Sequence, residues 1–176
     1  MHSHPDVEPL FKSWIEEHGG IIQRIARSFA KNAADAEDLR QEMLLQLWVT
    51  APKFSQQSKA STWIYRISFN TALMWHRGAS RRNRRIDSEC DLSQIQSGGM
   101  DPAEGVAQGE RLAQLYDSIR TMSKSDRTLV LMMLDDLSYR EIAEVTGLTE
   151  NQVGVGLTRA RKRLMEIMKG VTNELG

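Results

Sequence analysis

A quarter of the chain combines aromatic rings with positive charge and contains no carboxylate. Residues 43–86 hold eight Lys and Arg side chains, no Asp or Glu, and six of the protein's 11 aromatic residues. Cations bind phosphates and exposed rings stack on unpaired bases, so this composition suits single-stranded DNA. The same rings also suit the core of a small helical domain, where we expect roughly half of them to be buried packing residues.

Most of this chemistry falls on one expected helix, from Ser61 to about Arg77, with Ser61 or Thr62 as its N-cap. Ile64, Ile67 and Thr71 recur on one side, which predicts a face packed on a core. The other side mixes polar, cationic and aromatic groups, and we expect it to face DNA. Its members are Thr62, Arg66, Phe69, Asn70, Leu73 and Arg77.

A second candidate binding helix, Asp35–Thr50, precedes it. Leu39, Met43 and Leu47 form an apolar stripe that predicts burial. An acidic and partly apolar face lies on a different side, formed by Asp38, Gln41, Glu42 and Leu45. Such a face suits docking onto a helix of another protein, although periodicity alone favours a solvated face equally.

The C-terminal part of the chain carries the local signals of two helices joined by a glycine turn. Ser138 and Glu141 form a capping box that opens a helix over Tyr139–Val145, and Gly147 suits the left-handed residue that ends it. This layout is typical of a DNA-binding helix-turn-helix, with a plain helical hairpin and a solvated basic face as the alternative.

The helix after the turn is expected to be the longer one. Thr149 and Gln152 form a second capping box at its start. One apolar stripe predicts its buried side: Val153, Leu157, Ala160, Leu164 and Ile167. Four residues are expected to pack the two helices together: Ile142, Ala143, Leu148 and Val153. A basic cluster further along is expected to reach phosphates: Arg159, Arg161, Lys162 and Arg163.

Helical periodicity dominates the remaining sequence and predicts an all-α protein. The first helices are expected over Val7–His18 and Gly20–Ala30, broken at Gly19–Gly20. We expect two small helical domains, 7–86 and 107–170, joined by a flexible acidic linker over 87–106 that contains Ser97-Gly98-Gly99. The second domain contains the helix-turn-helix.

Formal net charge is zero, but the charges are segregated along the chain. Residues 43–86 carry a net charge of +8 and residues 87–117 a net charge of −6. A neutral total therefore does not exclude a nucleic-acid binder. We expect the acidic segment to screen the basic one in the free protein, so that the protein alone binds DNA poorly.

Several classes of protein are excluded by what the sequence lacks. It has no long apolar run for a membrane span and no secretion signal, so a cytoplasmic protein is expected. The single cysteine, Cys90, excludes a disulfide framework. No constellation of residues indicates an enzyme or a metal site, apart from a weak His2-x-His4 pair near the N-terminus.

Three stretches together resemble the sigma-70 family of bacterial RNA polymerase, and within it the small extracytoplasmic-function (ECF) sigma factors. Residues 35–48, DAEDLRQEMLLQLW, resemble the helix that binds core polymerase. Phe54, residues 61–70 (STWIYRISFN), Arg77 and the arginines after it resemble the promoter-melting helix. Residues 129–163 resemble the second DNA-binding domain, and the resemblance extends from about Leu10 to Met168.

The resemblance implies a sigma factor without cofactor, metal or catalytic residues, monomeric when free, that binds core RNA polymerase and promoter DNA in a stress or envelope response. It implies an anti-sigma factor as regulator. The implied core-polymerase residues are Asp38, Gln41, Glu42, Leu45 and Trp48. For the minus-ten element they are Lys59, Thr62, Trp63, Arg66, Asn70, Arg77 and Arg81. For the minus-thirty-five element they are Arg140, Thr149, Gln152, Thr158, Arg159, Arg161 and Arg163.

The sequence departs from the family pattern at three positions. Met74 stands where the group commonly has Asp, and Gly154 and Gly156 stand where its recognition helix usually has Lys and Arg. The glycines indicate a close approach of backbone to DNA or weak base reading, with Gln152, Thr158 and Arg159, or DNA shape, carrying more of the contact.

Two other functions remain open on the residues. An ordinary helix-turn-helix repressor or activator would bind duplex operator DNA by itself, usually as a dimer. A protein-only interaction module would bind polymerase or another regulator without reading DNA.

Overall fold

The computed structural model describes residues 7–83 and 106–174, leaving out the side chains of 76–83, 106–111 and 171–174. Within these ranges all regular elements are helices, and the predicted all-α class is confirmed. The chain divides into two compact units, Met1–Ser93 and Gln94–Gly176. The linker expected over 87–106 lies outside the described residues, apart from Val106, where a helix begins.

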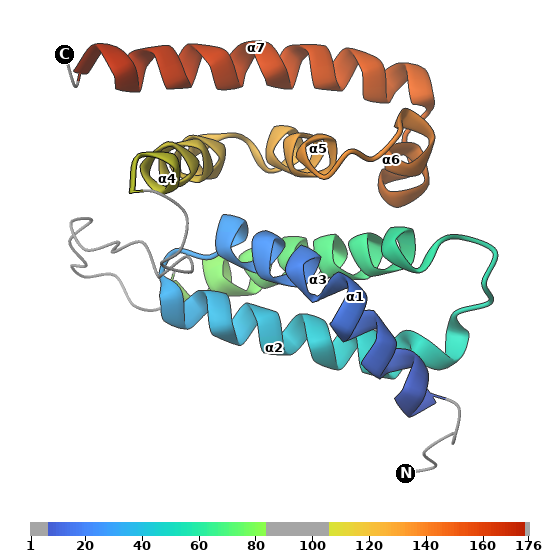
Figure 1. The fold of residues 1–176 in the computed structure, drawn as a ribbon. Helices are drawn as coiled ribbons and strands as arrows, with labels where there is room; N and C mark the ends of the chain where they lie inside the picture. The colour runs from blue at the N-terminus through green and yellow to red at the C-terminus, as the bar shows by residue number, and fades with distance from the viewer. Residues whose placement is uncertain (1–6, 84–105, 175–176) are drawn as a thin grey trace. The chain divides into compact units, whose positions relative to one another are not determined.

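Three helices make the first unit: α1 (Val7–Phe29), α2 (Ala33–Thr50) and α3 (Ala60–Asn83), with a short 3₁₀ helix, η1 (Ala51–Lys53), after α2. Figure 1 shows them packed against one another. Each contributes fully buried side chains to a shared core: Ile22, Ile25, Phe29, Leu39, Met43, Leu47, Ile64 and Tyr65. The stripe predicted for α2 is thus confirmed as its buried side.

The break expected in the first helix is wrong, because α1 runs continuously through Gly19 and Gly20. Each glycine costs a helix roughly 0.5–1 kcal/mol relative to Ala. The next turn buries Ile21, Ile22 and Ile25, and burial of such a side chain contributes about 1.5–3 kcal/mol. Packing of the isoleucines therefore outweighs the cost of the two glycines.

The starts of α2 and α3 differ in how they are capped. Asn32 is the N-cap of α2, and its side-chain oxygen accepts from the Asp35 amide at 2.8 Å. Helix α3 begins at Ala60, and the Trp63 amide donates to the Lys59 carbonyl at 3.1 Å. The expected N-cap at Ser61 or Thr62 is therefore wrong, because both residues lie inside the first turn.

Four helices make the second unit: α4 (Val106–Thr121), α5 (Lys124–Leu134), α6 (Tyr139–Thr146) and α7 (Glu150–Glu174). Helix α7 runs across α4 and α5, which Figure 1 shows nearly end-on. The corner between α4 and α5 is held by the buried Arg127, whose guanidinium donates to the carbonyls of Arg120 and Met122. Burial lowers the pKa of Arg127 from its ordinary value.

The predicted helix-turn-helix is confirmed in α6 and α7. Both halves of the Ser138–Glu141 capping box are present, and Gly147 ends α6 in the left-handed region with φ of 75°. The side-chain oxygen of Gln152 accepts from the backbone amide of Thr149 at 2.9 Å. The backbone amide of Gln152 donates to the Thr149 hydroxyl at 3.3 Å. Of the residues expected between the helices, Ile142 and Val153 are fully buried, whereas Leu148 is exposed on the turn.

Helix α7 lies very close to α5, and a glycine makes this possible. A Cβ atom at Gly156 would lie 2.7 Å from Cδ1 of Leu129, nearer than two carbons can approach. At Gly154 the same atom would lie 3.4 Å from Cε2 of Tyr139, at the edge of ordinary contact. A side chain at Gly156 would therefore displace Leu129, whereas one at Gly154 would fit.

We predict that Gly156→Ala lowers the free energy of unfolding of the second unit by about 1–3 kcal/mol, because the added methyl overpacks the contact with Leu129. Gly154→Ala is the matched control and should be neutral or stabilising by up to about 1 kcal/mol through helix propensity. Denaturant unfolding followed by far-ultraviolet circular dichroism measures both.

All four tryptophans belong to the first unit, so their fluorescence reports that unit alone. The fluorescence transition should be the same in both variants and the native chain. Equal effects of the two alanines on the circular dichroism transition would contradict the packing role of Gly156.

Candidate protein-binding and nucleic-acid-binding faces

The face of α2 opposite its buried stripe combines carboxylates with bare apolar side chains. Asp38 and Gln41 are exposed and Glu42 is half-buried. Leu45, one turn further, is 53% exposed. The sequence-predicted docking residues therefore share one accessible face of α2.

Hydrogen bonds along α2 fix several of these polar side chains. Glu37 accepts from Arg40 Nε at 2.8 Å and from Gln41 Nε2 at 3.1 Å. These bonds, that to Arg40 above all, lower the pKa of Glu37 to about 2. Gln46 Nε2 likewise donates to Glu42 at 2.9 Å. Gln41 and Glu42 therefore each have a hydrogen-bond partner on the same helix.

Two large apolar residues extend this face towards the end of α2. Trp48 is exposed at its rim, and its ring stands edge-on to Phe11 of α1 with centroids 5.1 Å apart. Val49 is 57% exposed and was missed by the sequence reasoning. Its position four residues after Leu45 was the signal that could have found it. We call Asp38, Gln41, Glu42, Leu45, Trp48 and Val49 the α2 face.

A second accessible stripe runs along α3. Lys59, just before the helix, and Asn70 are exposed, while Trp63 and Arg66 are half-buried. Met74, one turn after Asn70, is among the most exposed apolar residues. The spacings of three and four residues put these side chains on one side of the helix, which we call the α3 face.

Thr62 does not belong to the α3 face. It is 2% exposed and lies on the buried side of the helix, as does Phe69. The expectation that Thr62 and Phe69 face DNA is wrong, because both side chains are buried in the first unit. Arg77 and Arg81 fall within α3, but their side chains lie outside the described part of the structure.

Some of the aromatic residues near this face serve packing. Tyr65 and Phe69 are buried and stack with centroids 5.9 Å apart. Phe54 bridges two tryptophans, 5.2 Å from Trp14 and 5.7 Å from Trp63. Trp63 Nε1 is buried without a hydrogen-bond partner among the described residues. The packing interpretation therefore explains Tyr65 and Phe69, while Trp63 keeps an accessible edge.

The outward side of α7 begins directly after the turn of the helix-turn-helix. Gln152, Thr158 and Arg159 are exposed there, as are Thr149 on the turn and Arg163 further along. Val155 stands in the middle of this side, 64% exposed, and the sequence reasoning missed it. Val155 lies two residues after the buried Val153, and this spacing could have shown that its side chain points outward. We call Gln152, Val155, Thr158 and Arg159 the α7 face.

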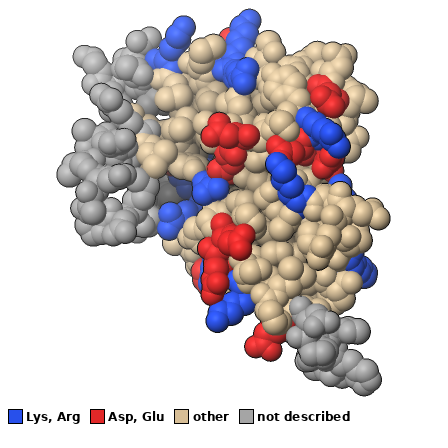
Figure 2. All heavy atoms as spheres, turned by 45° about the vertical axis from the view of Figure 1, so that its right-hand side comes forward, with Lys and Arg blue, Asp and Glu red and all other residues tan. Residues whose placement is uncertain are grey.

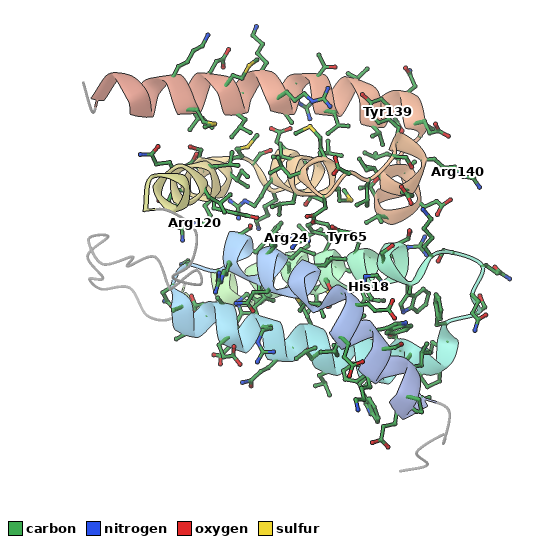
Figure 3. The ribbon with its side chains drawn as sticks, in the orientation of Figure 1. His18, Arg24, Tyr65, Arg120, Tyr139 and Arg140 are labelled. Atoms are coloured by element: carbon green, nitrogen blue, oxygen red, sulfur yellow. The ribbon has the colours of Figure 1, made fainter. Side chains whose placement is uncertain are left out.

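The candidate arginines of this unit differ in how they are held. Arg140 extends outward from the start of α6 (Figure 3) and pairs with Glu144 at 3.4 Å. Arg161 Nε lies 2.9 Å from the sulfur of Met133 on α5. Arg159 bonds the buried Asp126 of α5 through Nε at 3.3 Å and Nη2 at 3.1 Å. Only part of each guanidinium therefore remains available to a ligand.

Gly154 and Gly156, near the start of α7, do not lie where the departure from the family pattern suggested. Gly156 is buried against α5, and Gly154 faces the ring of Tyr139 at the start of α6. Neither glycine therefore belongs to the α7 face, whose four side chains are exposed.

On one face of the molecule, basic and acidic side chains lie close together in several places. Figure 2 shows Lys and Arg next to Asp and Glu across the visible face. Among the described residues no three His, Cys, Asp or Glu side chains are grouped to hold a metal ion. None of the described helices is both long and apolar enough to cross a membrane.

Two family models match the chain, one in each unit. Sigma-70 region 2 matches residues 14–82, and Sigma-70, region 4 matches residues 112–164. The first match contains α2 and most of α3, and the second contains the helix-turn-helix up to Leu164. Together they cover more than two thirds of the chain.

Curated relatives match along nearly the whole length. The ECF RNA polymerase sigma factor SigW of Bacillus subtilis is 28% identical over 170 residues, covering 92% of this chain and 90% of SigW. The RNA polymerase sigma factor SigV of the same bacterium is 28% identical over 167 residues, covering 95% of each chain.

Solved structures share the fold. The sigma factor RpoE of Bartonella quintana, in complex with the anti-sigma factor NepR, aligns with a TM-score of 0.72 at 24% identity, covering 90% of this chain and 96% of RpoE. CnrH, in complex with the cytosolic domain of CnrY, aligns with a TM-score of 0.64 at 20% identity, over 93% and 90% of the two chains. The two family matches, in the order in which the chain carries its two units, and the full-length relatives show that the chain belongs to the sigma-70 family and is a sigma factor of its extracytoplasmic-function group.

Proposed function

We propose that this sigma factor is a dissociable, non-enzymatic promoter-specificity subunit acting in the cytoplasm. It binds core RNA polymerase through the α2 face, opens the minus-ten element through the α3 face and binds the minus-thirty-five element through the α7 face. We assign these roles to residues 7–86 and 107–170, with 87–106 as the connection. The observation that carries the proposal is one chain that joins a helix-turn-helix to a separate unit with an exposed apolar docking face.

This combination argues against the two other functions. An operator-binding repressor has no need for the bare Leu45 and Val49 on a different unit from its helix-turn-helix. A protein-only module has no need for a capped recognition helix with a polar outer side. A sigma factor uses both features at once.

The α2 face supplies the chemistry of a helix-docking site. Leu45, Trp48 and Val49 offer apolar area, and the preorganised Glu42 and Gln41 border it with directional polar groups. A central apolar anchor inside a polar rim is the arrangement that stabilises protein interfaces. The acidic Asp38 further favours a basic helix as partner.

The α3 face supplies the chemistry of strand separation. Lys59 and Arg66 bring positive charge for phosphates, and the amide of Asn70 both donates and accepts hydrogen bonds. An unpaired base presents the same pair of functions on its edge, so Asn70 fits a base that has left the duplex. Met74 adds an apolar surface beside it.

Regulation by an anti-sigma factor follows from the same faces. RpoE and CnrH, which share this fold, are described in complexes with NepR and with the cytosolic domain of CnrY. We extend this to the present chain, with a stress or envelope response as its setting. A partner that covers the α2 face would keep the sigma factor from core polymerase.

The proposal is tested by run-off transcription with core polymerase of the bacterium that encodes the chain, using a library of its genomic fragments as template. Addition of the protein should produce transcripts with defined starts that core polymerase alone does not make. Their absence across the library would refute the proposal, and specific DNA binding without core polymerase would favour a repressor or activator.

We predict that Leu45→Asp weakens binding to core polymerase by at least about 30-fold, because a central apolar anchor is replaced by a charge. Leu45 is exposed, so the free energy of unfolding should change by no more than about 0.5 kcal/mol. Competition with labelled native protein for core polymerase measures the effect.

Val155→Asp is the control, since it makes the same change on the α7 face. It should keep its affinity for core polymerase and instead lose binding to the minus-thirty-five element, through repulsion from phosphates. Equal losses of core affinity in the two variants would refute the assignment of the α2 face.

We predict that Asn70→Ala slows formation of the open promoter complex by about tenfold, the effect of one lost hydrogen bond to a captured base. Permanganate reactivity of thymines in the minus-ten element follows the opening. Binding to core polymerase should be unchanged, because Asn70 lies on α3 and the docking residues on α2. A parallel loss of core affinity would contradict the role of Asn70 in melting.

A further inference from the structure

A buried carboxylate on α5 reaches the outward side of α7. Asp126 lies in the first turn of α5 and is 3% exposed. Its Oδ2 accepts from the hydroxyl of the N-cap residue Ser123 at 2.8 Å. Its Oδ1 accepts from Arg159, 33 residues further along the chain. Both carboxylate oxygens therefore have donors, and one of these comes from the α7 face.

Arg159 remains accessible although it is held. Its side chain is 64% exposed while that of Asp126 is almost completely covered. A guanidinium has five N–H groups, and the bonds to Asp126 use the edge formed by Nε and Nη2. Within the described residues, the edge formed by Nη1 and the second hydrogen of Nη2 has no hydrogen-bond partner. Arg159 lies one turn after Val155, so the two side chains share the exposed side of α7.

The free edge has the geometry of a base-reading group. Two parallel N–H donors of an arginine match the O6 and N7 acceptors of guanine in the major groove. A phosphate could accept the same pair, but the adjacent carboxylate offsets the positive charge that makes phosphate contacts strong. The Arg159 guanidinium is held in one direction, and the nearby carboxylate offsets its charge. Both features favour recognition of guanine over general attraction to the DNA backbone.

We propose that Asp126 is a positioning residue that holds Arg159 for a bidentate contact with one guanine of the minus-thirty-five element. The inference rests on the proposed function of the α7 face and deepens it. Releasing Arg159 would leave the Asp126 carboxylate buried without its charge partner, which is strongly unfavourable. The arginine is therefore already in position before DNA binds, and little side-chain entropy remains to be lost on binding.

The test uses holoenzyme reconstituted from core polymerase and the full chain. A pool of DNA duplexes with 40 random base pairs is selected for binding, and the best-bound duplex becomes the probe. Its upstream element is then varied one base pair at a time. The native protein should prefer guanine at one position by about tenfold or more. Arg159→Ala should abolish that preference and leave the other positions unchanged.

Asp126→Asn keeps the shape of the side chain and removes its charge. It should reduce the preference for the same guanine several-fold, and the double variant should discriminate no worse than Arg159→Ala alone. This non-additivity is expected only if Asp126 acts through Arg159. An independent loss in the double variant, or an even loss at all positions, would overturn the proposal.

Ser123→Ala is the matched control for stability. It removes the N-cap of α5, the hydroxyl that Asp126 also uses, and leaves the bonds between Asp126 and Arg159 in place. Promoter selectivity should be unchanged. A shift in selectivity as large as that of Asp126→Asn would show that Asp126 contributes only to stability.

Salt dependence separates a base contact from a phosphate contact. Arg159→Ala should change the slope of log affinity against log salt by much less than one, whereas a lost phosphate contact reduces it by about one. A fall of one in slope with unchanged base preference would overturn the proposal. If the native holoenzyme enriches no sequence at all, the proposed function itself fails, a result distinct from failure of Arg159 to discriminate.

Discussion

The close approach of α5 and α7 at Gly156 is the contact on which the arrangement of the second unit depends. A Cβ atom at this position would lie 2.7 Å from Cδ1 of Leu129, so any larger residue would force Leu129 to move from its place between the two helices. The close approach also brings Arg159 within reach of Asp126, because both residues lie near the same crossing. The packing requirement on the inner side of α7 thus determines the geometry of a charged group on its outer side.

The first unit follows the same division between helix faces without needing a glycine. Leu39, Met43 and Leu47 are fully buried, and this fixes the rotation of α2 about its axis. Leu45 and Val49 must then face outward, although both are as apolar as their buried neighbours. A buried stripe on one side is sufficient to hold the helix, so the other side is free to bind a partner.

Much of this was predictable because the signals are local. The two capping boxes, Gly147 and the stripe on α2 each involve residues a few positions apart, and all were found in the sequence. The errors arose where tertiary packing competes with a local preference. Gly19 and Gly20 do not break α1, and Thr62 is buried inside the first turn of α3 instead of capping it. The bond between Asp126 and Arg159 joins residues 33 positions apart, so no local pattern could reveal it.

Several arginines of the described surface are paired with carboxylates in the same way. Arg40 is bonded to Glu37, Arg120 to Asp117, and Arg159 to Asp126. Paired cations release few counterions on binding, so they add little general attraction to DNA. The pairing also fixes the direction in which the remaining N–H groups of each arginine point. In the proposed function, the pairing of Arg159 with Asp126 favours recognition of a particular base over general attraction to DNA.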